Sequence, residues 1–363
     1  MAKITLDQVR HSYTDRPESS SDWALKQLDL VWSDGGAYAL LGPYGCGNTT
    51  LLNVISGLLH PSEGRVLFDD RDVTAVPSDR RDIAQVFQFP VVYDTMSVYD
   101  NLAFPLRNRG VPEPQVKQRV QEIANMLELR DVLGNRASGL TADGKQKISL
   151  GRGLVRSDVN VIMFDEPLTV IDPHLKWQLR SKLKELHQQV RATMIYVTHD
   201  QTEALTFADH VVVMHDGQVV QIGTPVELFD KPKHTFVGHF IGSPGMNLLP
   251  CEIVDGCPTF LGHRLGTTEA VQPPTGAGRL EIGVRPEFIS FADAGLPVDI
   301  VRTDDVGRHR IVEVMHNSHT IKLLSPEDKP IPEGKGYLAF ERDKTNVYAD
   351  GWILEPGKRS WTD

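Results

Sequence analysis

The chain has 363 residues, a length that suits two domains, each able to bury its own core. Its hydrophobic fraction of 40% and charged fraction of 24% are those of an ordinary globular protein. A formal net charge of -10 argues against a general nucleic-acid binder. The cysteines, Cys46, Cys251 and Cys257, form no C-x-x-C pair, which suits a reducing compartment and predicts neither a disulfide framework nor a metal site.

The first six residues already read as a strand and lack the apolar stretch of a signal peptide. No run of apolar residues approaches the length of a membrane span. We therefore expect a soluble, cytoplasmic chain, which can still dock on a membrane partner.

Residues 37–57 predict a strand, a glycine-rich turn and a helix. The apolar run at 37–41 enters the glycine turn, and residues 49–55 read as a helix that ends at Gly57. Residues 65–68, followed by two aspartates at 69–70, predict a further strand and turn.

Residues 90–156 are predicted to be helical, because apolar residues recur there at helix spacing. The residues that carry this pattern are Val116, Val120, Ile123, Met126 and Leu127.

Two apolar, β-branched runs at 159–164 and 193–197 enclose a charged helix at 175–190. Strands buried on both faces show such runs, so the alternation predicts a wound α/β sheet. A hairpin is predicted at 210–222, with Asp216-Gly217 as its turn, and residues 223–225 then cap a short helix.

The pattern changes after about Phe240. Residues 242–245 form a linker-like break and residues 272–276 a loop. Short alternating strands are predicted at 281–284, 311–314, 320–324 and 336–340. We therefore predict an α/β domain over residues 1–240, with a helical subdomain at about 90–156, and a small all-β, barrel-like domain over 241–363.

Residues 41–50 match a phosphate-binding loop except at one position. The pattern G-x-x-x-x-G-K-[ST] uses backbone N–H groups to hold phosphates and its lysine to reach the outer ones. Asparagine stands in the place of that lysine. The candidate nucleotide-binding residues of the loop are Gly42, Pro43, Tyr44, Gly45, Cys46, Gly47, Asn48, Thr49 and Thr50.

Polar side chains follow two of the predicted strands. Asp165 and Glu166 end one strand, where an Asp can hold Mg²⁺ and a Glu can polarise an attacking water. His199 lies just past the next strand. Taken singly, the acidic pair is also compatible with helix capping, and the histidine with a satisfied structural group.

Taken together and in this order, these features resemble the ATP-binding-cassette (ABC) ATPases, a family with a P-loop α/β fold, bound ATP and Mg²⁺. The resemblance gives Tyr13 the place of the aromatic residue that stacks on adenine, and Gln88 that of the glutamine that senses the γ-phosphate. It makes Glu166 the catalytic base and His199 the switch histidine. Thr49, Gln88 and Asp165 become the metal-binding residues, and residues 169–172 match the dimer-contact loop.

The tail is similar to the sugar-importer branch of that family (maltose, glycerol and glycerol-3-phosphate importers). Gly283-Val284-Arg285-Pro286-Glu287 resembles a hallmark of the regulatory, OB-like (TOBE) barrel of these importers. The resemblance implies a second ABC ATPase subunit, two transmembrane permeases and a periplasmic or extracellular solute-binding protein as partners, and no nucleic acid. It places the chain at the cytoplasmic face of the inner or plasma membrane as a peripheral subunit. It leaves the solute undetermined.

Asn48 is the first departure from the family pattern. Asparagine can donate a hydrogen bond but supplies no cation. A charged hydrogen bond contributes about 1.5–3 kcal/mol, so phosphate binding is expected to weaken roughly ten- to a hundred-fold or more. Weak ATP binding then survives, whereas efficient hydrolysis by the isolated chain does not.

The second departure lies in the signature Leu-Ser-Gly-Gly-Gln, which aligns with Leu140-Thr141-Ala142-Asp143-Gly144. In this family the signature of one subunit closes over ATP bound to the other. Ala142 adds a methyl group where close approach is needed, and Asp143 puts a carboxylate near a phosphate. Two unit charges 4 Å apart repel by about 4 kcal/mol at an effective dielectric of 20, which is an upper bound if Asp143 points away.

These two departures favour a heterodimer, because a homodimer would carry both in both of its composite sites. We expect an importer subunit that couples ATP binding and hydrolysis to uptake of a sugar, polyol or glycerol-type solute. The alternatives are an ATP-binding regulatory subunit that does not hydrolyse, and a cassette protein acting on DNA or ribosomes. Recent loss of activity, or a substitution at position 48, also remains open.

Permease helices are expected to dock beside Gln88. The apolar residues that follow it are either the lining of that groove or simply core of the helical subdomain. They are Pro90, Val91, Tyr93, Met96 and Val98.

Overall fold

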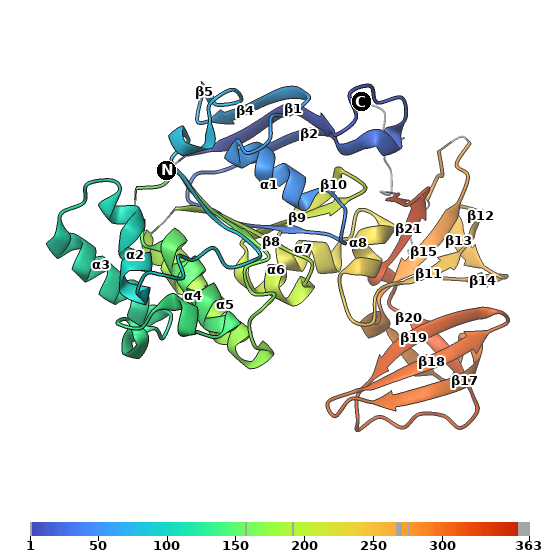
Figure 1. Cartoon of the computed structure of the whole chain (residues 1–363). Helices are drawn as coiled ribbons and strands as arrows, with labels where there is room; N and C mark the ends of the chain where they lie inside the picture. The colour runs from blue at the N-terminus through green and yellow to red at the C-terminus, as the bar shows by residue number, and fades with distance from the viewer. Residues whose placement is uncertain (1, 157, 191, 266–270, 275, 355–363) are drawn as a thin grey trace. The chain divides into compact units, whose positions relative to one another are not determined.

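The computed structural model describes the chain except residues 1, 157, 191, 266–270, 275 and 355–363. Met1 of the predicted N-terminal strand and Thr275 of the predicted loop lie outside the described residues. The chain divides into two compact units, residues 1–225 and 226–363 (Figure 1). None of the helices in the described part of the chain is both long enough and apolar enough to cross a membrane.

The first unit contains ten strands and six α-helices among its described residues. The strands are β1 (Ile4–Ser12), β2 (Trp23–Trp32), β3 (Ala37–Leu41), β4 (Glu63–Phe68), β5 (Arg71–Asp72), β6 (Ile83–Val86), β7 (Val161–Asp165), β8 (Thr193–Thr198), β9 (His210–His215) and β10 (Gln218–Gly223). The helices are α1 (Asn48–Ser56), α2 (Val98–Arg107), α3 (Glu113–Met126), α4 (Ala142–Leu154), α5 (Pro173–Val190) and α6 (Gln201–Phe207). Short 3-10 helices lie at Ser20–Asp22, Ser78–Arg80, Arg130–Val132 and Ala137–Gly139.

A six-stranded sheet in the order β10-β9-β3-β8-β7-β6 forms the centre of this unit. β3, β6, β7, β8 and β9 run parallel, and β10 joins β9 as the predicted antiparallel hairpin. Every residue of β3, β7 and β8 is buried, as expected for parallel strands covered on both faces. The α/β class predicted from the apolar runs is therefore confirmed.

A second sheet, in the order β2-β1-β4-β5, is antiparallel. Helix α1 lies between the two sheets (Figure 1), and its buried Leu51, Leu52, Val54 and Ile55 belong to one apolar cluster with residues of both. This packing holds the start of α1 at the carboxyl end of β3, where the glycine loop is.

Helices α2, α3 and α4 form the predicted helical segment. Val116, Val120, Ile123 and Leu127 are buried as their spacing indicates, while Met126 is only partly buried. Val98 is fully buried in the first turn of α2. Of the two alternatives predicted for Val98, it is therefore core of the helical subdomain and not lining of a docking groove.

In its described residues, the second unit is built from antiparallel strands and two short α-helices. Its helices are α7 (Pro225–Asp230) and α8 (Thr235–Phe240), with 3-10 helices at Pro286–Phe288 and Arg342–Lys344. Its strands are β11 (Asn247–Pro250), β12 (Glu252–Val254), β13 (Cys257–Phe260), β14 (His263–Arg264), β15 (Leu280–Val284), β16 (Ile289–Ala292), β17 (Leu296–Asp305), β18 (Arg310–His316), β19 (His319–Ser325), β20 (Lys335–Phe340), β21 (Thr345–Ala349) and β22 (Trp352–Ile353). They pair as β11-β15-β21-β22, β12-β13-β14 and β16-β20-β17-β18-β19.

These sheets enclose one apolar cluster that includes Phe260, Ile282, Val314, Ile321 and Leu338. The all-β character predicted for the tail is confirmed. The structural division at 225/226 places α8 and all of α7 except its first residue, Pro225, with the second unit, whereas the predicted domain boundary lies at 240/241. As a division of functional domains, 1–240 and 241–363 stay a prediction.

Arg285 explains why the motif at 283–287 suits this fold. Its guanidinium is 2% exposed and donates to the carbonyl oxygens of Phe229 (2.6 Å), Gly238 (3.2 Å), Leu228 (3.3 Å) and Ile241. Those carbonyls belong to the ends of α7 and α8, where helices leave acceptors without partners. Five fixed N–H donors can satisfy several of them at once.

Candidate functional site

The loop between β3 and α1 has the backbone that phosphate binding requires. Gly45 and Gly47 adopt φ of +81° and +103°, a region that costs other residues free energy. A Cβ on Gly42 would lie 2.4 Å from the Met214 carbonyl oxygen, and one on Gly47 would lie 2.7 Å from that of Ala24. Around Gly45, in contrast, the space is open. The loop therefore packs tightly against neighbouring backbone at Gly42 and Gly47 and is accessible at Gly45.

Helix α1 begins at Asn48, so its unpaired N–H groups and the positive end of its dipole belong to the loop. The other end of α1 is closed by Gly57 in the left-handed conformation and by Arg81. The buried Arg81 guanidinium donates to the carbonyl oxygens of Val54 (3.0 Å) and Ile55 (2.8 Å). The helix is thus fixed at both ends.

Asn48, in the place of the lysine, is 9% exposed. Its Oδ1 is buried without a hydrogen-bond partner among the described residues. A buried polar atom without a partner is uncommon, and each needs an explanation such as a ligand or water. This atom can only accept hydrogen bonds, so it does not bind an unprotonated phosphate oxygen. The backbone of the loop fits a phosphate, but the side chain at position 48 contributes no positive charge to it.

Thr49 and Asp165 form the predicted metal-binding pair. Thr49 Oγ1 donates to Asp165 Oδ1 over 3.4 Å, and Asp165 is 8% exposed at the end of β7. Burial, and then the charge of Glu166, raise the pKa of the Asp165 carboxyl group. Hydroxyl and carboxylate oxygens are ligands that Mg²⁺ accepts, with water and phosphate completing its shell. These residues fit a magnesium ion that arrives with a nucleotide.

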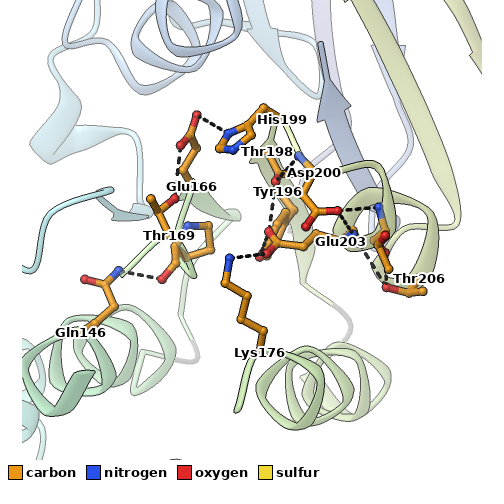
Figure 2. A network of polar contacts seen from close by, with 12 residues as sticks. Gln146, Glu166, Thr169, Lys176, Tyr196, Thr198, His199, Asp200, Glu203 and Thr206 are labelled. Atoms are coloured by element: carbon orange, nitrogen blue, oxygen red, sulfur yellow. Dashed lines mark hydrogen bonds and ion pairs between the residues drawn. The ribbon is translucent and has the colours of Figure 1, made fainter. Parts of the chain in front are cut away.

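Glu166 contacts the other two candidate catalytic residues, Gln88 and His199. Its backbone φ of +45° is rare outside glycine, and such strained conformations are typical of functional sites. Gln88 Nε2 donates to Glu166 Oε2 over 3.0 Å, and Thr169 Oγ1 donates to the same oxygen over 3.2 Å. Figure 2 shows the contacts of Glu166 with Thr169 and His199. The hydrogen bond of Gln88 goes to Glu166, and its predicted metal contact stays a prediction.

His199 lies between Glu166 and the glycine loop. Its Nδ1 is 3.2 Å from Glu166 Oε1, although the N–H direction does not complete a hydrogen bond. Its Nε2 is 2.8 Å from the hydroxyl of Tyr44, and the two ring centroids are 4.3 Å apart. The structure thus brings Tyr44, His199, Glu166 and Gln88 into one connected group.

Tyr13 lies on the same side of the unit as the loop. Its hydroxyl is 3.1 Å from Thr50 Oγ1 in the first turn of α1, and its side chain is 67% exposed. An exposed aromatic ring beside the start of α1 is compatible with stacking on a base. That role stays a prediction.

The altered signature begins helix α4. Thr141 caps the helix by accepting a hydrogen bond from the Gly144 N–H over 3.2 Å. The Asp143 carboxylate lies 3.6 Å from Lys147, four residues along the same helix. Lys147 also lies 3.7 Å from Glu128. Asp143 is therefore partly neutralised, so the repulsion of a phosphate falls below the upper bound derived from its sequence position.

Two further groups connect the site but were not assigned roles from the sequence. Gln146 of α4, which is fully buried, donates to the carbonyl oxygens of Pro167 (2.8 Å) and Phe87 (3.4 Å). It thereby joins the signature helix to the residues beside Glu166 and Gln88. Glu203 of α6 forms a second buried network next to His199 (Figure 2). Its position three residues after Asp200, a helix N-cap, is a signal visible in the sequence.

The parallel sheet, the glycine loop and the helix that starts at Asn48 define a P-loop nucleotide-binding protein. The family model described as ABC transporter matches residues 25–169. The chain is 39% identical over 337 residues to the sn-glycerol-3-phosphate import ATP-binding protein UgpC of Yersinia pestis bv. Antiqua, a match that covers 91% of this chain and 92% of that protein. It is 38% identical over 323 residues to the UgpC of Bordetella avium, covering 88% of both.

Two solved structures resemble the first part of the chain. The ATP-binding cassette MJ0796, in a dimeric post-hydrolysis state bound to ADP and Pi, has a TM-score of 0.55 and 26% identity and covers 61% of this chain and 98% of that one. CbiO1 from Clostridium perfringens, part of the transporter complex cbiONQ, has a TM-score of 0.56 and 27% identity, covering 63% and 90%. The chain belongs to the family of ABC transporter ATP-binding subunits, as the resemblance of its motifs implied.

Proposed function

We propose that the chain is the ATP-binding subunit of an importer for a sugar, polyol or glycerol-type solute, with glycerol-3-phosphate the first candidate. The names of the most similar relatives support this solute. The subunit couples ATP binding and hydrolysis to uptake at the cytoplasmic face of the membrane.

The residues of the site have distinct roles in this proposal. Glycine-loop N–H groups hold the phosphates. Thr49, Asp165 and Gln88 would hold a Mg²⁺ ion, which would offset phosphate charge. Glu166 orients and deprotonates the attacking water, since its carboxylate is held by Gln88 and Thr169. His199, next to Glu166, contacts the outer phosphate.

The subunit works as one half of a heterodimer with a second, intact cassette. The observation that carries this is the combination of a neutral Asn48 with a carboxylate at Asp143. Two copies of this chain would combine both changes in each composite site. With an intact partner, each composite site contains only one of the two changes. Gln88, Glu166 and His199 of this chain can then still take part in hydrolysis.

Two permeases dock beside Gln88. Phe89 is 72% exposed, Val91 49% and Tyr93 40%, which is unusual for neighbouring apolar side chains. A cavity of about 530 Å³ is lined by Met96 and Phe104 together with polar and charged residues such as Asp100, Arg107 and Arg136. An apolar helix end from a permease suits the exposed Phe89, Val91 and Tyr93, and the cavity offers charged partners beside them. An extracellular or periplasmic solute-binding protein delivers the solute.

ATP turnover by the purified chain tests the heterodimer. Hydrolysis by the chain alone is expected to equal that of its Glu166→Gln variant, which lacks the base. Addition of an intact cassette from the same transporter is expected to raise turnover above the sum of the separate chains. Robust hydrolysis by this chain alone would contradict the heterodimer.

A regulatory subunit that binds ATP without hydrolysing it is the second candidate function. The contact of Tyr44 with His199 favours it, because the imidazole nitrogen that would meet the outer phosphate is already engaged. Glu166→Gln in this chain, assembled with an intact partner, separates the two functions. Hydrolysis falls about two-fold or more if this chain contributes a working base, and is unchanged if it only regulates.

Transport assays test the solute. Cells lacking this chain are expected to lose uptake of labelled glycerol-3-phosphate, and uptake is expected to return with the wild-type chain. Loss of labelled maltose uptake alone would instead assign the importer to a sugar.

A further inference from the structure

Glu203 is a buried carboxylate that accepts a hydrogen bond from Thr198, the residue before His199. The residue lies in the first turn of α6 and is 3% exposed. Its Oε2 accepts hydrogen bonds from the hydroxyls of Tyr196 and Thr198, each over 3.0 Å. Its Oε1 lies 3.4 Å from Lys176 Nζ on α5. Figure 2 shows the three side chains converging on this one carboxylate.

The network holds the backbone on both sides of His199. Thr198 donates to Glu203 and accepts a hydrogen bond from the Asp200 N–H over 3.0 Å. The Asp200 carboxylate in turn accepts from the N–H groups of Thr202 (2.7 Å) and Glu203 (3.3 Å). Both residues next to His199 in the sequence are thus tied to the start of α6, which limits the directions available to the imidazole.

The same network reaches the loop that follows Glu166. The Lys176 N–H donates to the Asp172 carbonyl oxygen over 3.1 Å, in the first turn of α5. At the other end of that loop, Thr169 donates to Glu166. These contacts connect Glu166 to His199 by a second route. The loop 169–172 leads from Glu166 to Lys176, Lys176 pairs with Glu203, and Glu203 bonds to Thr198, the residue before His199. The His199 ring in turn lies beside Glu166.

Packing alone does not explain a carboxylate at position 203. Burying an ion has a large desolvation penalty, and apolar residues of similar volume often give equal or higher stability. The surrounding Phe164, Tyr196 and Phe207 already pack together. Arg180, which is 8% exposed, is a further charged side chain that acts on Tyr196 of this network. Directed hydrogen bonds from Glu203 fix the orientation of the groups that they join, which apolar packing does less well.

We propose that Glu203 and Lys176 are positioning residues that fix the direction of the His199 imidazole relative to Glu166 and link it to the loop 169–172. The inference rests on the proposed function, in which His199 serves ATP hydrolysis. Neither residue touches the reacting atoms, and both act through Thr198 and the first turn of α5.

Three variants test it. Lys176→Met removes a partly exposed cation and keeps the length of the side chain. Glu203→Gln keeps an acceptor for Tyr196 and Thr198 but removes the charge that faces Lys176. Lys184→Met is the matched control, because Lys184 also joins α5 to α6, through the Thr206 carbonyl oxygen at 3.1 Å, without contacting Glu203. Lys176→Arg keeps a cation at this position and tests whether the charge alone preserves the contact with Glu203.

The first readout needs no nucleotide. Histidine side-chain ¹⁵N signals are recorded on the full chain, with the His199 signal identified by its loss in His199→Gln. Both test variants are expected to shift it, while Lys184→Met and Lys176→Arg leave it in place. An unchanged signal in Lys176→Met overturns the inference, and this variant suffices if Glu203→Gln does not fold.

The second readout is ATP hydrolysis in the assembly with the partner cassette and permeases. Misplacing His199 is expected to lower kcat roughly ten-fold with KM changed less than about two-fold, and Lys176→Arg is expected to restore it. Equal loss in Lys184→Met would overturn the inference as well. Shifted His199 signals without any hydrolysis in the wild-type assembly would contradict the proposed function and leave the positioning of His199 supported.

Discussion

The hydroxyl of Tyr44 lies 2.8 Å from Nε2 of His199, and the two rings are inclined at 38° with centroids 4.3 Å apart. Desolvation, and then the charge of Glu166, raise the pKa of the Tyr44 phenol. Either group can donate in this pair: the phenol to an unprotonated Nε2, or an Nε2–H group to the phenol oxygen. In both cases a residue of the glycine loop occupies the Nε2 atom of His199.

Removing this hydroxyl is expected to strengthen nucleotide binding. In Tyr44→Phe the ring remains, but Nε2 becomes free for a phosphate. A neutral hydrogen bond contributes about 0.5–1.5 kcal/mol, so the Kd for ATP is expected to fall roughly two- to ten-fold. Titration calorimetry measures this, with Tyr13→Phe as the control, because that substitution removes a phenol hydroxyl that contacts Thr50 and not His199. Weaker binding would instead identify the Tyr44 hydroxyl as a donor to the phosphate.

Restoring the missing cation is expected to have a larger effect. Asn48→Lys adds a charged hydrogen bond of about 1.5–3 kcal/mol, which corresponds to a roughly ten- to hundred-fold lower Kd for ATP. Asn48→Met, similar in length but neutral, separates charge from packing in the same calorimetric experiment. Equal gains in both variants would show that the buried Oδ1, and not the lack of charge, weakens binding.

Asp143 is expected to stabilise helix α4, even though its charge repels a phosphate. It lies in the first turn of α4, where an acidic side chain interacts favourably with the helix dipole, and it faces Lys147. Asp143→Asn is therefore expected to lower the free energy of unfolding by about 0.3–1 kcal/mol. Urea denaturation measures the loss, and raised salt is expected to reduce it. A more stable variant would contradict the ion pair.

Loss of Arg285 is expected to destabilise the second unit. Arg285→Met leaves the carbonyl groups of Leu228, Phe229, Gly238 and Ile241 without their donor. Unpaired buried groups cost about 1–3 kcal/mol each before relaxation, so a loss of roughly 3 kcal/mol or more is expected. Hydrogen exchange should show lost protection at 226–241. Arg302→Met, which removes an exposed pair with Asp304, is the control with about 0–1 kcal/mol.

The thiol of Cys251 gives a pH-dependent prediction. Burial, and then the charge of Glu281, raise its pKa to about 11. Because the thiolate is the reactive form, alkylation by iodoacetamide is expected to rise with pH up to about 11 in a Cys46→Ser/Cys257→Ser chain. The unfolded thiol loses its proton at about pH 8.5, so stability from this group is present below that pH and is lost between there and about 11. A reaction rate that levels off near pH 8.5 would contradict the buried thiol.

Local patterns predicted most of the elements that carry the site. The run at 37–41, the glycine turn and the helix after it depend on neighbouring residues, and β3 and α1 match them. The apolar runs before Asp165 and His199 likewise match β7 and β8. The antiparallel sheet of β1, β2, β4 and β5 was not foreseen as a unit, because its pairing joins residues as distant as Ile4 and Phe68.

The sequence by itself determined which chemical groups are available: a glycine loop, Asp165, Glu166 and His199, no lysine at position 48, and a carboxylate at position 143. Only the tertiary structure decided where those groups point. Tyr44 contacts His199, Asp143 pairs with Lys147, Val98 is in the core, and Glu203 accepts a hydrogen bond from Thr198, next to His199. Residue type is local information, whereas side-chain direction depends on packing against segments far away in the chain, such as Tyr44 against His199, 155 residues later.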